Sequence, residues 1–135
     1  MSEAFRVDVR SVDGGPTALS WGGSVTVVID RPAEAGGRGL GFSGGQLLNL
    51  AVAGCVSNDL FREAARRGIR LDHVRVVAES DYVGSPATST PIAYKVELSG
   101  DASPEALADL VAYVDEIAEI PNSIRRGTKV QLKPD

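Results

Sequence analysis

The sequence contains one cysteine, Cys55, and one histidine, His73, in 135 residues. A lone cysteine cannot form a disulfide within the chain, which favours a reducing cytoplasm as the location. His73 has no second histidine or cysteine with which to share a metal ion, so neither a metal site nor a cofactor is expected. A Ser-His-Asp triad cannot be argued either, because nothing in the pattern brings a serine towards His73.

Long apolar runs and clusters of basic residues are also lacking. No stretch approaches the ~20 apolar residues that cross a bilayer, and the first ten residues contain no apolar signal region. The 14 basic and 18 acidic residues give a net charge of −4, and the basic ones are scattered. The sequence therefore predicts neither a membrane segment nor the basic surface that nucleic-acid binding requires.

What the sequence does contain is enough aliphatic residues for a globular core. Hydrophobic residues make up 43% of the chain, although only three Phe, three Tyr and one Trp are present. A chain of this length buries roughly 70% of the surface that it exposes when unfolded. We therefore expect one domain over residues 1–135, with a mainly aliphatic core.

The first half of the chain predicts two strands and one long helix. Residues 4–12 alternate apolar and polar side chains, residues 24–30 are rich in β-branched residues, and turn residues lie between them. A glycine-rich loop over residues 31–45 leads to a helix over residues 46–67, which Gly68 caps. Because residues 47–56 of this helix are apolar on nearly all sides, we expect it to be buried centrally or at a subunit interface.

The second half predicts another hairpin, a helix and a last strand. Residues 73–83 and 91–100 are the hairpin strands, and Ser103 followed by Pro104 begins a helix that ends near residue 120. Residues 128–133 are predicted to form a final strand. The order β-β-α-β-β-α-β, with strands in pairs, indicates an α+β fold with antiparallel pairs.

Two motifs in the chain carry little weight. The segment GLGFSG, from Gly39 to Gly44, matches a dinucleotide-binding pattern only formally, because no strand leads directly into it and the acidic Asp59 lies inside a helix. We interpret the segment as a flexible connection, with a small anion at the following helix N-terminus as the alternative. The carboxylates of Asp115, Glu116 and Glu119 are interpreted as a solvated helix face.

Cys55 is the candidate for chemistry. Asp59 and Arg62 follow four and seven residues later, so all three side chains share one stripe of the predicted helix. Arg62 would favour a reactive thiolate, whereas Asp59 and apolar burial would oppose it. A buried cysteine can equally be core filling. The residues alone leave both interpretations open.

Residues 41–82, which contain LAVAGCVSND and GIRLD, and residues 94–124 resemble the OsmC/Ohr family of organic hydroperoxide resistance proteins. The resemblance implies an intertwined homodimer with two long central helices wrapped by sheets from both chains. It also implies, for active members, a peroxidase in which a first cysteine attacks an organic hydroperoxide and a second cysteine then closes a disulfide. Cys55 occupies the position of the first cysteine.

The chain departs from the pattern of active members at three positions. Ile120, before Pro121, stands where the resemblance places the second cysteine, and Gly45, beside Gln46, stands where it places a glutamate. That glutamate would bind an arginine of the first hairpin, but residues 11–30 contain no arginine or lysine. Without this cation, a thiol with an ordinary pKa of about 8.5 is only a few per cent ionised at neutral pH.

Two functions therefore remain possible at this point. The first is a degenerate OsmC/Ohr-like dimer that is not an efficient peroxidase and that binds a hydrophobic small molecule near Cys55 and the glycine loop. The alternative is a one-cysteine thiol peroxidase, in which Cys55 reduces organic hydroperoxides and an external thiol, or Cys55 of the other chain, resolves the product. Arg62 and Asp59 would modulate the thiol in either case.

Overall fold

The computed structural model describes residues 5–134, whose tertiary contacts group the chain into one unit up to Leu48 and another from Asn49. The first unit holds a three-stranded antiparallel sheet in the order β1 (Asp8–Ser11), β2 (Ala18–Gly22) and β3 (Val25–Ile29). β2 lies in a stretch that the sequence predicts as a turn, so this part of the prediction is wrong. Of the predicted strand over residues 4–12, only β1 forms, and Ala4 lies outside the described residues.

The register of this sheet makes one face mainly apolar, whereas the other face mixes apolar and polar side chains. Val9 pairs with Ser20, and Ser20 pairs with Val27, so these side chains share one face with Val7, Val25 and Ile29. Val7, Val9 and Val25 on this face are each more than half exposed. The alternation that the sequence predicts is therefore present, but the single chain leaves much of the apolar face open to solvent.

The central helix, α1 (Gly44–Arg66), begins two residues before its predicted start. Ser43 and Gln46 bond each other's backbone: the Ser43 N–H donates to Gln46 Oε1 at 2.9 Å, and the Gln46 N–H donates to Ser43 Oγ at 3.4 Å. This reciprocal capping box fixes the start of the helix. At the other end Gly68 has a φ of 69°, and the Ile69 N–H reaches the Ala64 carbonyl, which confirms the predicted glycine cap.

One face of α1 is buried and the opposite face is not. Val56 and Leu60 are almost fully buried, whereas Leu50 and Phe61 are 48% and 49% exposed. Central burial within the single chain is therefore not found, and burial at a subunit interface stays a prediction. Within residues 5–134, about half of the Leu50 and Phe61 side chains is left exposed to solvent.

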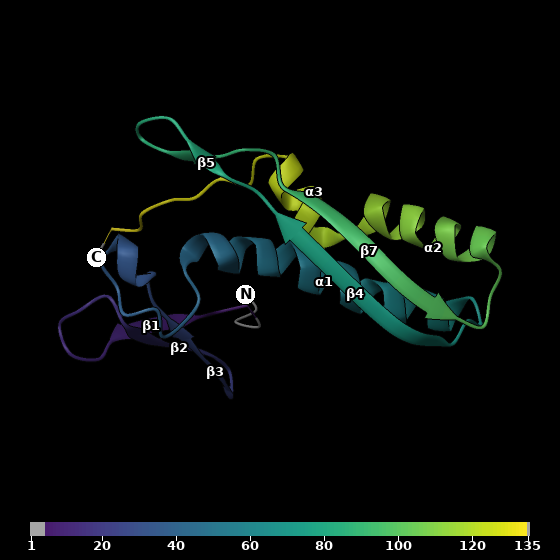
Figure 1. The fold of residues 1–135 in the computed structure, drawn as a ribbon, viewed down its shortest axis with the longest axis horizontal. Helices are drawn as coiled ribbons and strands as arrows, with labels where there is room; N and C mark the ends of the chain where they lie inside the picture. The colour runs from purple at the N-terminus through teal and green to yellow at the C-terminus, as the bar shows by residue number, and fades with distance from the viewer. Residues whose placement is uncertain (1–4, 135) are drawn as a thin grey trace. The chain divides into compact units, whose positions relative to one another are not determined.

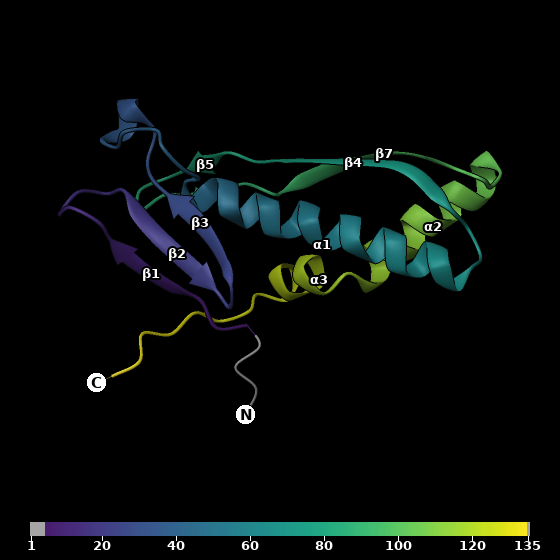
Figure 2. The same cartoon turned by 90° about the horizontal axis from the view of Figure 1, so that it is seen from below.

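The second unit packs a long β-ribbon against helices (Figures 1 and 2). The strands β4 (Leu71–Glu79) and β7 (Ala93–Gly100) pair antiparallel, and a short hairpin of β5 (Tyr82–Val83) and β6 (Thr88–Ser89) lies between them in sequence. The apolar alternation of Ile92, Tyr94, Val96 and Leu98 predicts that these side chains face inward, and Tyr94, Val96 and Leu98 do pack inward. They pack on a core of side chains from the helices: Val56, Leu60, Ala64, Leu110, Val114 and Ala118.

The C-terminal part differs from its prediction in two ways. The predicted helix ends early as α2 (Pro104–Ile117), after which α3 (Glu119–Arg125) forms a separate short helix. Ser103 caps α2 as predicted, because its hydroxyl accepts the Ala106 N–H at 3.1 Å. The predicted last strand over residues 128–133 does not form, and Val130 and Leu132 are 97% and 99% exposed. A strand needs a neighbour, and this segment has no strand partner among the described residues of the chain.

The fold as a whole is α+β with antiparallel strand pairs, as the sequence predicts. The glycine-rich loop contains a short 3-10 turn, η1 (Ala33–Ala35), before it reaches α1. Within residues 5–134, none of the helices combines the length and the apolar character needed to cross a bilayer.

Candidate functional site

Cys55 lies in the middle of α1, and its side chain is only partly buried. It packs beside the aliphatic core that Val56 and Leu60 form with α2. No hydrogen bond or ion pair to its sulfur is found among residues 5–134. The surroundings of the thiol within the described chain are therefore mainly those of a core residue, with one side left open.

Arg62, the nearest candidate cation in the sequence, is bound to carboxylates. Its Nε donates to Glu63 Oε2 at 2.9 Å, and its Nη1 lies 3.3 Å from Asp59 Oδ1. The bond to Glu63, followed by the charge of Asp59, raises the pKa of Arg62, and the same bond lowers the pKa of Glu63. The guanidinium is thus neutralised by two acidic groups of its own helix.

Asp59 and Glu63 are unusual because both carboxylates are buried. Glu63 is satisfied by Arg62 and by Arg66, whose Nη1 lies 2.9 Å from Glu63 Oε2. Asp59 is 7% exposed, and its Oδ2 is the one buried side-chain polar atom without a hydrogen-bond partner among the described residues. Cys55, Asp59 and Arg62 therefore all lie on α1 as predicted, and Arg62 contacts both Asp59 and Glu63.

The positions that the family resemblance singles out carry no reactive groups. Ile120 is in the first turn of α3, and Pro121 behind it is buried. Gly45 lies in the first turn of α1, where Gln46 uses its side chain to cap Ser43. No second thiol and no glutamate stands at these places.

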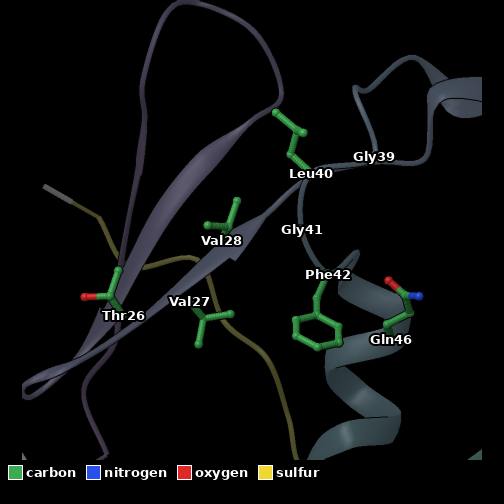
Figure 3. A pocket seen from close by; sticks show the side chains of 8 residues that line it. All are labelled: Thr26, Val27, Val28, Gly39, Leu40, Gly41, Phe42 and Gln46. Atoms are coloured by element: carbon green, nitrogen blue, oxygen red, sulfur yellow. The ribbon is translucent and has the colours of Figure 1, made fainter.

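A pocket of about 470 Å³ lies between the glycine loop and strand β3, in the first unit (Figure 3). Its apolar lining includes Leu40 and Phe42, which are 62% and 43% exposed, and Val28 on the strand. Polar side chains border the same pocket at Thr26 and Gln46. The full lining is Thr26, Val27, Val28, Gly39, Leu40, Gly41, Phe42 and Gln46.

The loop wall of this pocket lies directly on β3. The Phe42 N–H donates to the Val28 carbonyl at 3.0 Å, and the Asp30 N–H donates to the Phe42 carbonyl at the same distance. A Cβ atom on Gly41 would lie within 2.2 Å of the Val28 carbonyl oxygen, so only glycine permits this approach. The loop that the sequence predicts as a flexible connection is therefore held against the sheet by backbone bonds.

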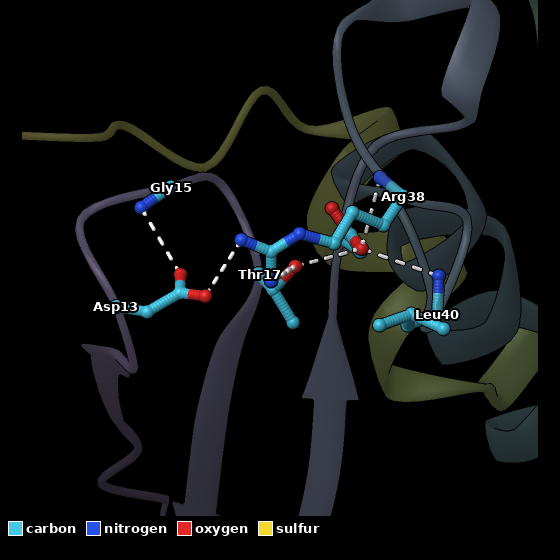
Figure 4. Close-up of polar contacts among 6 residues, drawn as sticks. Asp13, Gly15, Thr17, Arg38 and Leu40 are labelled. Atoms are coloured by element: carbon cyan, nitrogen blue, oxygen red, sulfur yellow. Dashed lines mark hydrogen bonds and ion pairs between the residues drawn. The ribbon is translucent and has the colours of Figure 1, made fainter.

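A buried carboxylate, Asp30, organises the same loop, and Figure 4 labels its partners Thr17, Arg38 and Leu40. Its Oδ1 accepts the Arg31 N–H at 2.8 Å, and its Oδ2 accepts the Thr17 hydroxyl at 3.0 Å and the Leu40 N–H at 3.2 Å. Burial alone would raise the pKa of Asp30, but the N–H groups of Leu40 and Arg31 and the Thr17 hydroxyl bring it below its usual value. Asp30 is therefore ionised at neutral pH and holds the loop backbone in the first unit through these hydrogen bonds.

Sequence reasoning missed this network and the cation that belongs to it. Arg38, in the glycine loop, reaches back to the turn between β1 and β2, where its Nη2 lies 2.6 Å from Asp13 Oδ2. Its Nη1 also donates to Thr17 Oγ1 at 3.2 Å. Residues 11–30 contain no arginine or lysine, but the turn between β1 and β2 receives a cation from 25 residues further along the chain. The capping pair of Ser43 and Gln46 was missed as well, although its S-x-x-Q spacing is a local signal.

The remaining candidates have structural contacts. His73 is exposed on β4, and no cluster of metal-ligating side chains occurs in the part of the chain that the structure describes. Glu116 and Glu119 lie near the end of α2 and at the start of α3. Asp115 is not simply solvated: it accepts the Tyr94 hydroxyl at 2.5 Å and Arg125 Nη2 at 2.7 Å. Burial, together with this bond, raises the pKa of Tyr94, and the cluster ties β7 and α2 to α3.

The family model and the solved structures both relate this chain to OsmC-like proteins. The model of the OsmC-like protein family matches residues 36–133. The structure of an OsmC-like protein from Mycoplasma pneumoniae has a TM-score of 0.79 at 14% identity, over 95% of this chain and 91% of that one. No significant match to a curated protein is found for this chain.

Two further solved structures carry names that refer to hydroperoxides or small molecules. The organic hydroperoxide resistance protein OhrB of Bacillus subtilis has a TM-score of 0.62 at 21% identity, over 90% of both chains. A protein from Vibrio cholerae, which has a molecule of captopril bound in one of its active sites, has a TM-score of 0.63 at 20% identity, over 94% of this chain and 89% of that one. At these identities the likeness is one of fold.

Proposed function

Because the chain belongs to the OsmC-like protein family, we propose that it is a dimeric member that binds a hydrophobic small molecule and is not an efficient peroxidase. The observation that carries this proposal is the contrast between a formed pocket beside the glycine loop and a cysteine without activating partners. A reducing cytoplasm suits the lone thiol.

The proposal that the protein is not an efficient peroxidase is supported by the hydrogen bonds of Arg62 and Arg38. Attack on a peroxide requires a thiolate, which a neighbouring positive charge would stabilise. Arg62 is bound to Glu63 and Asp59, and Arg38 is bound to Asp13 and Thr17. Each guanidinium would have to leave its present partners before it could assist a thiolate.

Ligand binding is supported by the lining of the glycine-loop pocket. Leu40 and Phe42 present apolar surface to solvent although both belong to a loop with a defined backbone. Covering such surface gains about 25 cal/mol per Å², and a few polar groups at the border, here Thr26 and Gln46, can orient a ligand. This composition favours a ligand with an apolar body and one hydrogen-bonding end.

Dimer formation is supported by apolar surface that the single chain leaves open. The first unit exposes Val7, Val9 and Val25 on one sheet face, and α1 exposes Leu50 and Phe61. Monomeric soluble proteins seldom leave such contiguous apolar patches uncovered. The C-terminal residues Val130 and Leu132 alternate with polar residues and are nearly fully exposed, as expected for a strand whose neighbour belongs to another copy.

The binding proposal is tested with Nile red, a neutral dye whose fluorescence rises in apolar sites. We expect saturable binding to the native protein, and at least a severalfold weaker affinity in Leu40→Ser, which removes exposed apolar surface from the pocket. Val83→Ser is the matched control, because Val83 is similarly exposed but lies outside the pocket. Equal loss in both variants, or no saturable binding at all, would contradict the proposal.

The dimer is tested by light scattering after size exclusion. We expect twice the chain mass of 14.1 kDa for the native protein. Val9→Lys places a charge on the apolar sheet face and should shift the protein to the mass of one chain, because burying an unpaired lysine at an interface is costly. Val83→Lys should remain dimeric. A native protein that runs as a stable monomer would exclude this part of the proposal.

A one-cysteine thiol peroxidase remains the second candidate, because Cys55 is not fully buried and relatives of the same fold carry names that refer to organic hydroperoxides. In that reaction the thiolate attacks one peroxide oxygen, the O–O bond breaks, and an alcohol and a Cys55 sulfenic acid result. A first external thiol then forms a mixed disulfide and releases water, and a second thiol restores Cys55.

Cumene hydroperoxide consumption separates the two candidates. We expect the native protein with dithiothreitol to consume peroxide no faster than Cys55→Ser. A native rate well above that of Cys55→Ser would favour the peroxidase, whatever the outcome of the dye titration.

A further inference from the structure

The shape of the glycine-loop pocket depends on how the loop backbone is held. Leu40 and Phe42 are too exposed for their own burial to fix their positions. Two backbone donors do so instead: the Phe42 N–H bonds to Val28 on β3, and the Leu40 N–H bonds to the Asp30 carboxylate. The first contact belongs to the sheet, whereas the second depends on a side chain and its neighbours.

The Asp30 carboxylate is in turn linked to Arg38 through Thr17. Asp30 Oδ2 accepts the Thr17 hydroxyl at 3.0 Å and the Arg38 N–H at 3.3 Å. The Thr17 hydroxyl has one proton, which it donates to Asp30, and its oxygen accepts Arg38 Nη1 at 3.2 Å. The Arg38 guanidinium is therefore connected to the buried Asp30 carboxylate through a single bridging hydroxyl, that of Thr17.

Arg38 is anchored at its far end by Asp13. Its Nη2 lies 2.6 Å from Asp13 Oδ2, and Asp13 Oδ1 accepts the Gly15 N–H in the same turn. The bond to Arg38 is the main cause of the lowered pKa of Asp13. A continuous chain of contacts thus runs from the β1–β2 turn through Arg38, Thr17 and Asp30 to the Leu40 amide (Figure 4).

We propose that the Asp13–Arg38 pair latches the glycine loop in the conformation that forms the pocket wall, so that Arg38 is a positioning residue for the pocket's ligand. The part that concerns a ligand rests on the proposed binding function; the part that concerns the loop does not. An isolated exposed ion pair contributes little to stability. This pair differs because its guanidinium also bonds Thr17, which bonds the carboxylate that holds the loop.

The test measures hydrogen exchange of the Leu40 amide in the native protein and in two variants, Arg38→Gln and Asp13→Asn. Both variants break the pair at partly exposed side chains, so the fold is expected to persist, and a thermal scan verifies this. We expect Leu40 to exchange about three- to fivefold faster in each variant, the range that loss of an exposed but connected ion pair implies. Nile red affinity should fall by a similar factor, and the neutral dye excludes a direct charge effect.

Arg10→Gln is the matched control. It removes another arginine–aspartate pair of the same sheet, between Arg10 and Asp8, which has no bond to the loop. Unchanged Leu40 exchange in both Arg38→Gln and Asp13→Asn, or equal acceleration in Arg10→Gln, would overturn the latch. Faster exchange in a protein that does not bind Nile red would retain the latch and reject the proposed binding function.

Discussion

Each of the two units is stabilised internally by a different kind of interaction. In the first unit the only buried side chains among residues 5–48 are Thr17, Ala18 and Asp30, and the Asp30 carboxylate accepts four hydrogen bonds that organise the backbone around it. In the second unit the buried centre is aliphatic, with Leu60, Leu110 and Val114 wholly covered. Polar bonds fix directions and aliphatic packing does not, which suits the first unit to shaping a pocket and the second to stability.

Charged groups also behave differently in the two units. In the first unit the Asp30 carboxylate accepts hydrogen bonds from the Arg31 and Leu40 amides, so its charge acts on the position of the loop backbone. On α1 the charged groups bond to other side chains, Arg62 and Arg66 to Glu63, and do not reach the sulfur. A cation near a cysteine in sequence is therefore not evidence of an activated thiol.

The largest effect is expected in the aliphatic core. Leu60→Ala removes a side chain that is 0% exposed and should lower the free energy of unfolding by about 2–5 kcal/mol. Val77→Ala, at a 40% exposed position of the same unit, should cost clearly less. Urea unfolding followed by circular dichroism measures both, and equal losses would mean that the core does not centre on Leu60.

A smaller effect is expected at the buried carboxylate. Asp30→Asn keeps the shape but places an amide group where N–H donors converge, and should lower Tm by about 5–10 °C. Leu40 exchange should accelerate more than in Arg38→Gln, because the acceptor itself is lost. A variant with unchanged Tm and unchanged exchange would show that other contacts hold the loop.

Acid should affect the first unit through the same group. The pKa of Asp30 lies below its unfolded value, so its contribution to stability is complete above about pH 4 and is lost as the pH falls through the folded pKa. Glu63 has the same direction of shift and acts in the second unit. Thermal scans should show Tm falling as the pH is lowered below about 4, less steeply in Asp30→Asn. A Tm that rises towards acid pH would contradict both assignments.

The smallest effect, close to none, is expected for Arg62 on the thiol. Because its guanidinium is bound to Glu63 and Asp59, Arg62→Gln should leave the rate of Cys55 alkylation by iodoacetamide at pH 7 within about twofold of the native rate. Arg75→Gln, at an exposed site on β4, controls for a general change in charge. A tenfold slower reaction in Arg62→Gln alone would identify Arg62 as an activating cation.

Local signals predicted several features of this fold well. The glycine cap at Gly68, the Ser103 cap of α2 and the inward alternation of β7 all follow from residues within a few positions of each other. β2 escaped prediction because its five residues lie between glycine-rich turns and carry too short an alternation. The Arg38 contact escaped because its partner is 25 residues away, and the last strand was predicted from an alternation that finds no neighbouring strand among residues 5–134.

The order of amino acids alone determined the α+β class, the helices α1 and α2, the lone thiol and the absence of a cation from residues 11–30, since each is a local or compositional property. Only the tertiary structure decided which groups the arginines bond: Arg62 bonds Glu63, and Arg38 bonds Asp13 in the β1–β2 turn. The physical reason is distance. Periodicity acts over a few residues, whereas a hydrogen bond forms between whichever donor and acceptor the folded backbone brings within about 3 Å.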